Sequence, residues 1–157
     1  MSNNTESEQL DWTKGFNVVA GHINLGLTEA SPESGEYWVG VMRGELLLKQ
    51  CSNCARHLHP RRMGCPDCYK AKLNWVKASG NGTVYTFSTV YRSPAPEFDK
   101  SVPYCVGIVG LSEGVYLFTR VFTVDGSEPA IGDPVELDFR VLENGQRLPV
   151  FLCRGES

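Results

Sequence analysis

Four of the six cysteines stand as two Cys-x2-Cys pairs that lie close together in the chain. The first pair is Cys51 and Cys54, the second is Cys65 and Cys68, and ten residues separate the pairs. Each pair can form a tight turn that directs two sulfur atoms at one point, and two such turns supply the four thiolates of a tetrahedral metal site. The spacing therefore predicts a rubredoxin-like knuckle pair, also called a zinc ribbon, with Zn(II) as its cofactor.

Two other uses of these cysteines stay open. A pair of disulfides would need an oxidising compartment, and nothing in the sequence indicates secretion. Four thiolates also bind iron, as in a stand-alone electron carrier, although no redox-partner motif accompanies the cluster. We expect zinc, and because four protein ligands leave no open coordination position, we expect the metal to be structural and not catalytic.

No arrangement of residues typical of catalysis stands out. The chain contains neither a Gly-rich phosphate loop nor a Gly-x-Ser-x-Gly motif. Cys105 and Cys153 lie in apolar segments and are expected to be small core residues of strands. His57 and His59 lie between the cysteine pairs, where we expect polar hairpin side chains. We therefore expect no catalytic residue and no activity of the chain alone.

Charge is unevenly distributed along the chain. Residues 43–77 carry eight Lys or Arg and two acidic residues, a balance of +6, whereas residues 1–42 have a balance of −5 and residues 78–157 of −4. A basic island of this kind attracts phosphates, whether on nucleic acid or on a nucleotide-bearing small molecule. The alternative is a solvated face whose charges keep a small ribbon soluble.

The compartment is predicted from the N-terminus and the cysteines. Residues 1–9 are polar and acidic, which is not typical of a signal peptide. No apolar run approaches membrane-spanning length. Thiolate ligands and free cysteines fit a reducing compartment, so we expect a cytoplasmic protein with no membrane partner.

Composition divides the chain into three parts. Residues 1–35 form an N-terminal extension that we expect to be partly disordered or to dock on a partner. Residues 36–78 hold a short helix and the zinc ribbon. Residues 79–157 are predicted to be entirely β. In the helix, Tyr37, Trp38, Val41 and Met42 are predicted to share one face, and Gly44 is predicted to end it.

The third part is predicted to form a small closed barrel. Its segments alternate or are rich in β-branched and aromatic residues, and an Asn-Gly pair at 144–145 is typical of a hairpin. The five strands are expected at 83–91, 104–111, 115–122, 135–142 and 148–153. In the fourth, Val135, Leu137, Phe139 and Val141 are predicted to face one way. The long 124–131 connection favours an OB-fold over an SH3-like barrel because it leaves room for a Greek-key crossing.

The order of these parts carries a family resemblance. Its motifs are Leu-x-Leu-x-Gln-Cys at 46–51, Pro60 and Arg62 before the second cysteine pair, Trp-Val at 75–76, Ser-Gly-x-Gly-x-Val-Tyr-Thr at 79–86, Pro-Tyr at 103–104, Gly-Asp-Pro-Val at 132–135 and Leu-Pro-Val-Phe at 148–151. Over residues 36–153 the chain resembles the zinc ribbon plus OB-fold proteins associated with acyl-CoA metabolism. Arg61 stands where that family usually shows a second proline, and residues 1–35 lie outside the pattern.

The resemblance implies a non-catalytic accessory subunit in a hetero-oligomer. Such proteins accompany thiolase-like enzymes, including the aldolases of sterol side-chain breakdown in lipid and steroid degradation. Others join a thiolase to hydroxymethylglutaryl-CoA synthase or accompany MaoC-like enoyl-CoA hydratases. The resemblance implies that the ribbon and helix bind the partner while the barrel covers or channels the acyl-CoA. The whole enzyme would be a carbon-carbon lyase or an acyltransferase.

The resemblance also gives roles to residues outside the metal site. Tyr37, Trp38 and Met42 are candidate anchors for the partner, with the alternative that they cover the open end of the chain's own barrel. The CoA phosphates would be held by basic residues of the ribbon, for which the candidates are Arg56, Arg61, Arg62, Lys70 and Lys72.

A single-stranded nucleic-acid-binding module is the competing function. OB barrels bind single strands by stacking bases on aromatic side chains over a basic groove, and Tyr85, Phe87 and Tyr91 are available for stacking. The barrel segment is acidic, however, whereas a strand-binding face is expected to be basic. We therefore expect no nucleic-acid partner.

Overall fold

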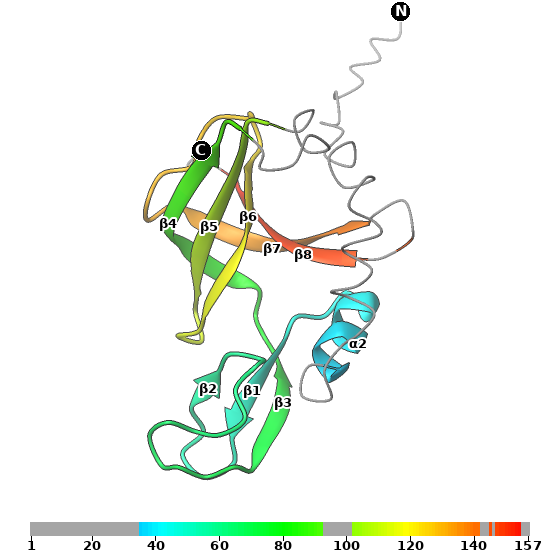
Figure 1. Cartoon of the computed structure of the whole chain (residues 1–157), viewed down its shortest axis with the longest axis vertical. Coiled ribbons are helices and arrows are strands. Elements are labelled where there is room, and N and C mark those ends of the chain that lie inside the picture. The colour runs from blue at the N-terminus through cyan, green and yellow to red at the C-terminus, as the bar shows by residue number, and fades with distance from the viewer. Residues whose placement is uncertain (1–34, 93–101, 142–144, 146, 155–157) are drawn as a thin grey trace, which may run out of the picture.

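The computed structural model describes residues 35–92, 102–141, 145 and 147–154 (Figure 1). Expectations for residues 1–34 lie outside this part of the chain. Its elements are α2 (Gly35–Arg43), β1 (Leu47–Cys51), β2 (His57–Leu58), β3 (Leu73–Lys77), β4 (Asn81–Val90), β5 (Tyr104–Leu111), β6 (Tyr116–Thr123), β7 (Pro134–Val141) and β8 (Arg147–Cys153). Within the described residues, none of the helical segments has both the length and the apolar character needed to cross a bilayer.

Helix α2 ends where the sequence predicts. Gly44 has a φ of +80°, a left-handed conformation that glycine adopts without a steric penalty. The Gly44 N–H donates to the Val41 carbonyl at 3.0 Å, and the Glu45 N–H donates to the Gly40 carbonyl at 2.8 Å. These two bonds form a Schellman motif, which satisfies carbonyl groups at the end of the helix and turns the chain towards β1.

The apolar residues of α2 do not all share one face, which corrects the prediction. Tyr37 packs against the barrel core and Val41 is fully buried, whereas Met42 is 50% exposed and Trp38 is half-buried. Successive residues of an α-helix are about 100° apart around its axis, so Trp38 and Met42 are rotated away from the buried pair.

The ribbon contains a three-stranded antiparallel sheet in the order β2-β1-β3 (Figure 1). In the central pairing, Leu47 lies opposite Lys77 and Cys51 lies opposite Leu73. The register places Cys51 at the end of β1, so that the chain enters the first knuckle directly from the sheet.

The second sheet is a closed five-stranded barrel in the order β4-β5-β6-β8-β7. Pairing of β4 with β7 closes it, and β6 and β8 are parallel while the other pairs are antiparallel. The connection after β6 crosses to place β7 beyond β8, which is the Greek-key crossing expected of an OB-fold. The predicted fold, mainly β with a helix, a ribbon and an OB barrel, is thus confirmed.

Burial along β7 is greatest at the start of the strand. Val135 is buried and Leu137 packs on the core, but Val141 is 50% exposed. Residues 134–136 pair with β4, and residues 135 and 136 pair with β8 as well, whereas the later residues pair with β8 alone. That end of β7 therefore extends beyond the closed part of the barrel.

Ribbon and barrel share one hydrophobic core. Leu46 and Leu48, at the start of the ribbon sheet, are fully buried in the same cluster as Val84 and Val109 of the barrel. The Ala78 N–H donates to the Leu46 carbonyl at 2.8 Å. The ribbon is consequently fixed to the barrel by packing as well as by the chain.

The turn between β5 and β6 adds polar contacts to this junction. The Ser112 N–H donates to the Asn81 carbonyl at 2.9 Å, and the Glu113 carboxylate accepts the Ser79 N–H. These bonds hold the β5–β6 hairpin against the segment that leaves the ribbon, so the hairpin faces β2 and its following turn.

Candidate metal centre and adjoining hollow

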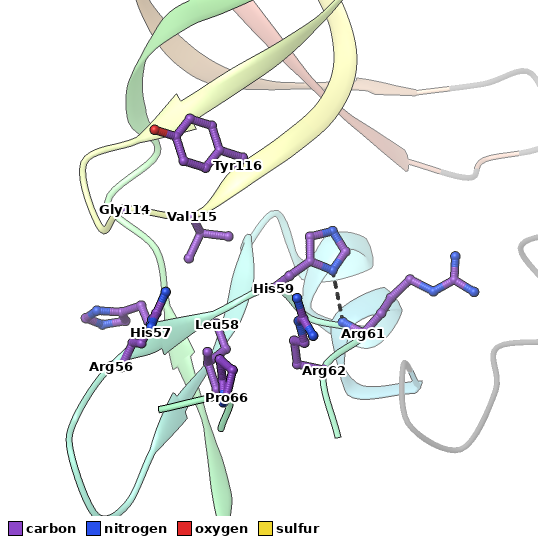
Figure 2. Close-up of a pocket in the computed structure, with 10 residues that line it drawn as sticks. All are labelled: Arg56, His57, Leu58, His59, Arg61, Arg62, Pro66, Gly114, Val115 and Tyr116. Carbon is purple, nitrogen blue, oxygen red and sulfur yellow. Dashed lines mark hydrogen bonds between the residues drawn. The ribbon is translucent and has the colours of Figure 1, made fainter. Parts of the chain in front are cut away.

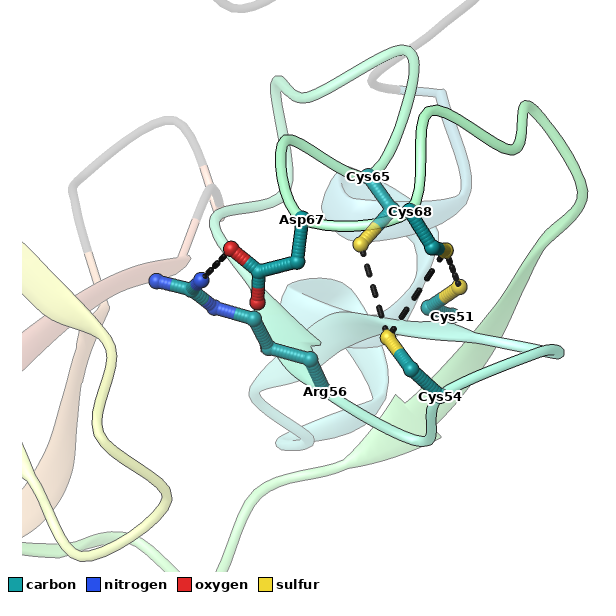
Figure 3. Close-up of polar contacts among 6 residues, drawn as sticks. All are labelled: Cys51, Cys54, Arg56, Cys65, Asp67 and Cys68. Atoms are coloured by element: carbon teal, nitrogen blue, oxygen red, sulfur yellow. Dashed lines mark hydrogen bonds and ion pairs between the residues drawn. The ribbon is translucent and has the colours of Figure 1, made fainter.

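The structure brings the four predicted ligands together (Figure 3). Their sulfur atoms all lie within 4.8 Å of one another. The Sγ–Sγ distances are 3.4 Å for Cys51 and Cys68, 3.5 Å for Cys54 and Cys65, and 3.9 Å for Cys54 and Cys68. A tetrahedral ion with metal–sulfur bonds of about 2.3 Å requires separations of about 3.8 Å. The four thiols therefore fit one metal ion.

The alternative of two disulfides is excluded by the same geometry. All six cysteines are free. The separations within the cluster are well above the S–S bond length of about 2.05 Å. The cluster is thus arranged for a metal and not for covalent pairing.

The two knuckles have the same backbone geometry. In each, the N–H of the first cysteine donates to the carbonyl five residues on, and the N–H four residues on donates back to the cysteine carbonyl, all at 2.9 Å. The residue after the second cysteine has a positive φ, 60° at Ala55 and 57° at Tyr69. Nothing in the sequence indicates these conformations, because neither residue is the glycine or asparagine that usually marks them.

Backbone amides inside the knuckles stabilise thiolates. The pKa of the Cys51 thiol is lowered to about 6, by the Cys54 N–H and then by the Asn53 N–H, whose nitrogen lies 3.4 Å from the sulfur. The pKa of Cys65 is lowered in the same way, first by the Cys68 N–H. Because the thiolate is the form that binds a metal, this geometry favours coordination by the first cysteine of each knuckle. The pKa of Cys54 is instead raised to about 12: the Arg56 N–H lowers it, but the hydrogen bond with the Cys65 sulfur and burial together raise it by more.

A buried lysine supports the turn between the knuckles. Lys49 is only 8% exposed, its Nζ donates to the Arg62 carbonyl at 2.8 Å, and it lies 4.8 Å from the centre of the Trp75 ring. The bond ties the turn after β2 to the sheet. Sequence reasoning missed Lys49, because a lysine in a short strand is ordinarily solvent-exposed.

A hollow of about 580 Å³ lies between this turn and the β5–β6 hairpin (Figure 2). Three of the five basic residues proposed for phosphate binding, Arg56, Arg61 and Arg62, line it. The others, Lys70 and Lys72, are exposed outside it. The remaining lining residues are His57, Leu58, His59, Pro66, Gly114, Val115 and Tyr116.

The basic residues of the hollow differ in their partners. Arg56 forms an ion pair with Asp67 (Figure 3). The Arg61 N–H donates to Nδ1 of His59 at 3.2 Å, so that nitrogen is unprotonated (Figure 2). The pKa of His59 is lowered by burial and then by the charges of Arg61 and Arg62.

The candidate partner anchors are only partly available. Tyr37 is not exposed as expected: it packs on the core, and burial raises the pKa of its hydroxyl to about 12. Trp38 meets the Tyr37 ring edge-on, with ring centres 5.0 Å apart. Tyr37 thus serves the chain's own packing, whereas Trp38 is half-buried and Met42 is exposed.

The candidate base-stacking residues are also separated. Phe87 packs on the barrel core, so it is not a stacking platform. Tyr85 is 59% exposed, and Tyr91 is exposed with its hydroxyl donating to Glu128 at 3.0 Å. The three rings do not form one exposed face.

The two remaining cysteines lie in strands, as predicted. Cys153 is buried in the core, and burial raises the pKa of its thiol to about 11. Cys105 is half-buried, with its sulfur 3.5 Å from the Thr89 hydroxyl.

The fold and site define a class: a four-cysteine ribbon fixed by a shared core to an OB-fold barrel. The ChsH2 rubredoxin-like zinc ribbon domain matches residues 38–74, and the C-terminal OB-fold domain of ChsH2 matches residues 75–140. The chain is 37% identical, over 66% of its length and 79% of the relative, to a DUF35 domain-containing scaffold protein of Methanothermobacter thermautotrophicus. It belongs to this family of ChsH2-type, or DUF35, proteins.

Two further similarities concern proteins of larger assemblies. The solved structure of the Ltp2-ChsH2(DUF35) aldolase matches with a TM-score of 0.70 and 29% identity, over 80% of this chain and 97% of that one. A probable enoyl-CoA hydratase alpha subunit of Thermomonospora curvata is 34% identical over 68% of this chain. The chain spans about a third of that relative, 33% of its length.

Proposed function

We propose that this protein is a non-catalytic accessory subunit that holds a thiolase-like enzyme, such as an aldolase acting on acyl-CoA, in its working assembly. The observation that carries the proposal is the match of ribbon and barrel to a scaffold protein and to a chain of the solved Ltp2-ChsH2(DUF35) aldolase. The shared core makes ribbon and barrel one body, which suits a scaffold because a docking surface must keep its shape. We propose no catalytic residue in this chain.

We further propose that the four thiolates bind zinc. When bound, the ion supplies a structural cross-link between the two knuckles and no reaction chemistry. Metal analysis of the purified protein should give one zinc per chain. A coloured protein with one iron per chain would replace zinc by iron and revive the electron-carrier alternative.

The proposal assigns partner contact to α2 and the ribbon, with Trp38 and Met42 as anchors. Exposed aromatic and methionine side chains contribute strongly to interface energy. In this arrangement the barrel lies beside the bound acyl-CoA, and basic side chains of the ribbon help to hold the phosphates. A reducing cytoplasm would keep the thiolates available for the metal.

Co-expression with a thiolase-like enzyme from the same genome, followed by size-exclusion chromatography, tests the proposal. A stable hetero-oligomer with acyl-CoA activity that neither chain shows alone is expected. Elution of the two chains as separate species would contradict it, as would full turnover of a thioester by the isolated chain.

Trp38→Ala should weaken this assembly about tenfold or more, because a half-buried ring is lost from the proposed interface. Val124→Ala is the matched control, since it removes apolar surface from a 72% exposed side chain on a barrel loop. Equal affinity of both variants for the partner would return Trp38 to a purely structural role.

A MaoC-like enoyl-CoA hydratase is the second candidate partner. The similarity to an enoyl-CoA hydratase alpha subunit favours it, because there a region like this chain forms about a third of a longer protein, 33% of its length. Co-expression with a hydratase subunit in parallel distinguishes the two partners: the one that forms the stable complex is the physiological class.

A further inference from the structure

The outward face of β4, β5 and β6 differs from the rest of the barrel surface because it is almost uncharged. Val84, Val109 and Leu117 point into the core, and side chains alternate along a strand, so the residues on either side of them point outward. Among the outward residues of these three strands, all of which the structure describes, only Arg120 is charged. On β7, by contrast, the three outward residues within 136–140 are all charged.

Large apolar side chains on this face are open to solvent. Phe118 is 75% exposed, and Tyr85 and Tyr116, which meet edge-on with ring centres 5.0 Å apart, are 59% and 55% exposed. Ile108 lies beside Phe118 in the sheet and is half-buried. Because a Phe or Tyr side chain offers about 150–250 Å² of surface, these three rings alone expose about 400 Å². A contiguous apolar patch of this size is often an interaction site.

The outward side chains change in size from one strand of this face to the next. In the row across the centre of the face, Phe118 of β6 lies beside Ile108 of β5, which in turn lies beside Thr86 of β4. In the next row, Arg120 of β6 and Ser88 of β4 occupy the corresponding ends. Large side chains therefore stand on the β6 side of these rows, and short hydroxyl side chains stand on the β4 side.

This difference in size makes the face complementary to itself. If a second copy of the chain lies face to face with the first, related by a two-fold axis along β5, the β6 strand of each copy lies over the β4 strand of the other. Phe118 of one copy then meets Thr86 of the other, and the two Ile108 side chains meet at the axis. Two sheets packed face to face, about 10 Å apart, are stabilised in this way by large side chains that fill the space above short ones.

We propose that the outward face of β4, β5 and β6 binds the same face of a second copy of this chain. Residues 78–157 have a charge balance of −4, so two barrels repel each other wherever their acidic surfaces meet. A face without acidic residues avoids this repulsion, and Arg120, whose guanidinium carbon lies 4.2 Å from the centre of the Tyr104 ring, would lie opposite the Ser88 hydroxyl of the other copy. The exposed rings of both copies supply about 800 Å² of buried area, and their half-buried neighbours raise the total towards the roughly 1,200 Å² of a small specific interface.

The enzyme-binding surface proposed above lies elsewhere on the chain. Trp38 and Met42 belong to α2, which packs on β1 and β8 (Figure 1). In the barrel order β4-β5-β6-β8-β7, strand β6 separates β8 from β5. A dimer through β4, β5 and β6 therefore leaves α2 accessible, and it would join two scaffold chains that each hold an enzyme.

Analytical ultracentrifugation of the full chain tests the dimer directly. The wild type should change from monomer to dimer with a dissociation constant on the order of 10 µM, because small interfaces form weak complexes. Phe118→Glu should weaken dimerisation about tenfold or more, because each copy would bury a carboxylate against Thr86 without a counter-charge. Ile131→Glu is the matched control, since it adds the same charge to a 70% exposed side chain on the loop before β7, and it should leave dimerisation unchanged. A wild type that stays monomeric at millimolar concentration, or equal effects of the two variants, would overturn the proposal.

A pair of oppositely charged variants tests how the two copies are arranged. Thr86→Lys alone should weaken dimerisation as Phe118→Glu does. In an equimolar mixture of the two variants, the heterodimer has one ion pair and one native contact, so it should form about tenfold or more tighter than either homodimer. Val90→Lys is the control, because Val90 also points outward on β4 but lies four residues, about 13 Å, from Thr86, and its mixture with Phe118→Glu should show no such gain. A mixture of Thr86→Lys and Phe118→Glu that associates no better than the Val90→Lys mixture would contradict the two-fold arrangement.

Co-expression of Phe118→Glu with the enzyme partner separates this inference from the proposed function. The variant should capture the enzyme as the wild type does, but in an assembly of smaller mass. Loss of enzyme capture in Phe118→Glu would assign the face to the enzyme and overturn the second-copy proposal. A wild-type dimer that captures no enzyme would sink the scaffold role and leave the dimer intact.

Discussion

Tyr37 shows at the scale of one residue how the helix is attached to the rest of the molecule. Its ring packs on the barrel core, and burial raises the pKa of its hydroxyl to about 12 from an ordinary value of 10.0. Burial disfavours the phenolate because the charge would lose its water. Tyr37, a candidate surface anchor from the sequence, therefore packs inside the molecule and attaches α2 to the barrel.

The raised pKa of Tyr37 predicts a loss of stability in alkaline solution. Between pH 10 and 12 the unfolded chain releases the phenolic proton while the folded chain keeps it, so the free energy of unfolding falls as the pH rises through this range. The decrease in the free energy of unfolding is at most about 3 kcal/mol. Denaturant unfolding of wild type and Tyr37→Phe at pH 9 and 11.5 should show a smaller decrease in the variant.

Tyr69→Phe is the control for this measurement, because the Tyr69 side chain is 88% exposed. Its decrease in unfolding free energy over the same pH range should match that of the wild type. If Tyr37→Phe also matched the wild type, burial would not be perturbing the Tyr37 hydroxyl.

At the scale of elements, the close approach of α2 and β1 depends on a glycine. A Cβ atom on Gly40 would lie 2.7 Å from Cδ1 and Cγ of Leu47 and 3.1 Å from the Glu45 carbonyl oxygen. Gly40 is buried within the helix, and Leu47 lies on the strand that leads to the first knuckle. The absence of a side chain thus lets the helix rest on the ribbon sheet.

Gly40→Ala tests this packing against helix propensity. The substitution gains about 1 kcal/mol of helix propensity, but overpacking at a tight contact costs about 1–3 kcal/mol. We expect a net loss of about 1 kcal/mol in thermal or denaturant unfolding. Gly35→Ala is the matched control, since a Cβ atom at that position would have no neighbour within 4 Å, and it should be neutral or stabilising. A stabilised Gly40→Ala would mean that the helix does not rest on β1.

At the scale of the whole molecule, metal binding and barrel stability are linked through the shared core. Leu46 and Leu48 are fully buried in the barrel cluster, and β1, which contains Leu48, ends at the ligand Cys51. A ribbon that loses its metal has few other contacts to hold it, since its own cluster centres on Cys51, Leu58 and Cys65. Disorder of the knuckles would therefore loosen two leucines of the barrel core.

Chelation of the metal should consequently destabilise the barrel as well as the ribbon. We expect the unfolding temperature to fall by about 10 °C or more, because poorer burial of a core leucine costs about 2 kcal/mol or more. Hydrogen exchange of β5 and β6, measured by mass spectrometry, should become faster after chelation and in Cys51→Ala. Acid should release the metal in the same way, because protons compete for the thiolates.

Cys105→Ala serves as the control for loss of a thiol outside the cluster. It should leave the metal content unchanged and the exchange of β6 close to that of the wild type. Unaltered exchange in β5 and β6 after complete metal removal would show that ribbon and barrel are energetically independent.

Much of the architecture was predictable because it is encoded locally. The paired cysteines predicted the ribbon, and Gly44 predicted the end of the helix. Alternating residues predicted the five barrel strands, and each predicted strand end lies within two residues of the observed one. The long connection after β6 favoured the OB-fold that the strand order confirms. For Tyr37 the sequence left open a partner contact or packing on the chain's own barrel, and the structure shows the packing. A sequence pattern does not show which side of an amphipathic residue the core will cover.

The amino-acid order was enough to establish the metal cluster, the succession of elements and the family, because spacing and periodicity act over a few residues and survive without knowledge of distant contacts. Which basic side chains share a space depended on how the folded chain packs. Arg61, Arg62 and Tyr116 line one hollow because the shared core and the polar bonds of the β5–β6 turn set the ribbon against the barrel. Lys70 and Lys72 carry the same charge but do not line the hollow, because charge alone does not determine where a side chain lies in the folded chain.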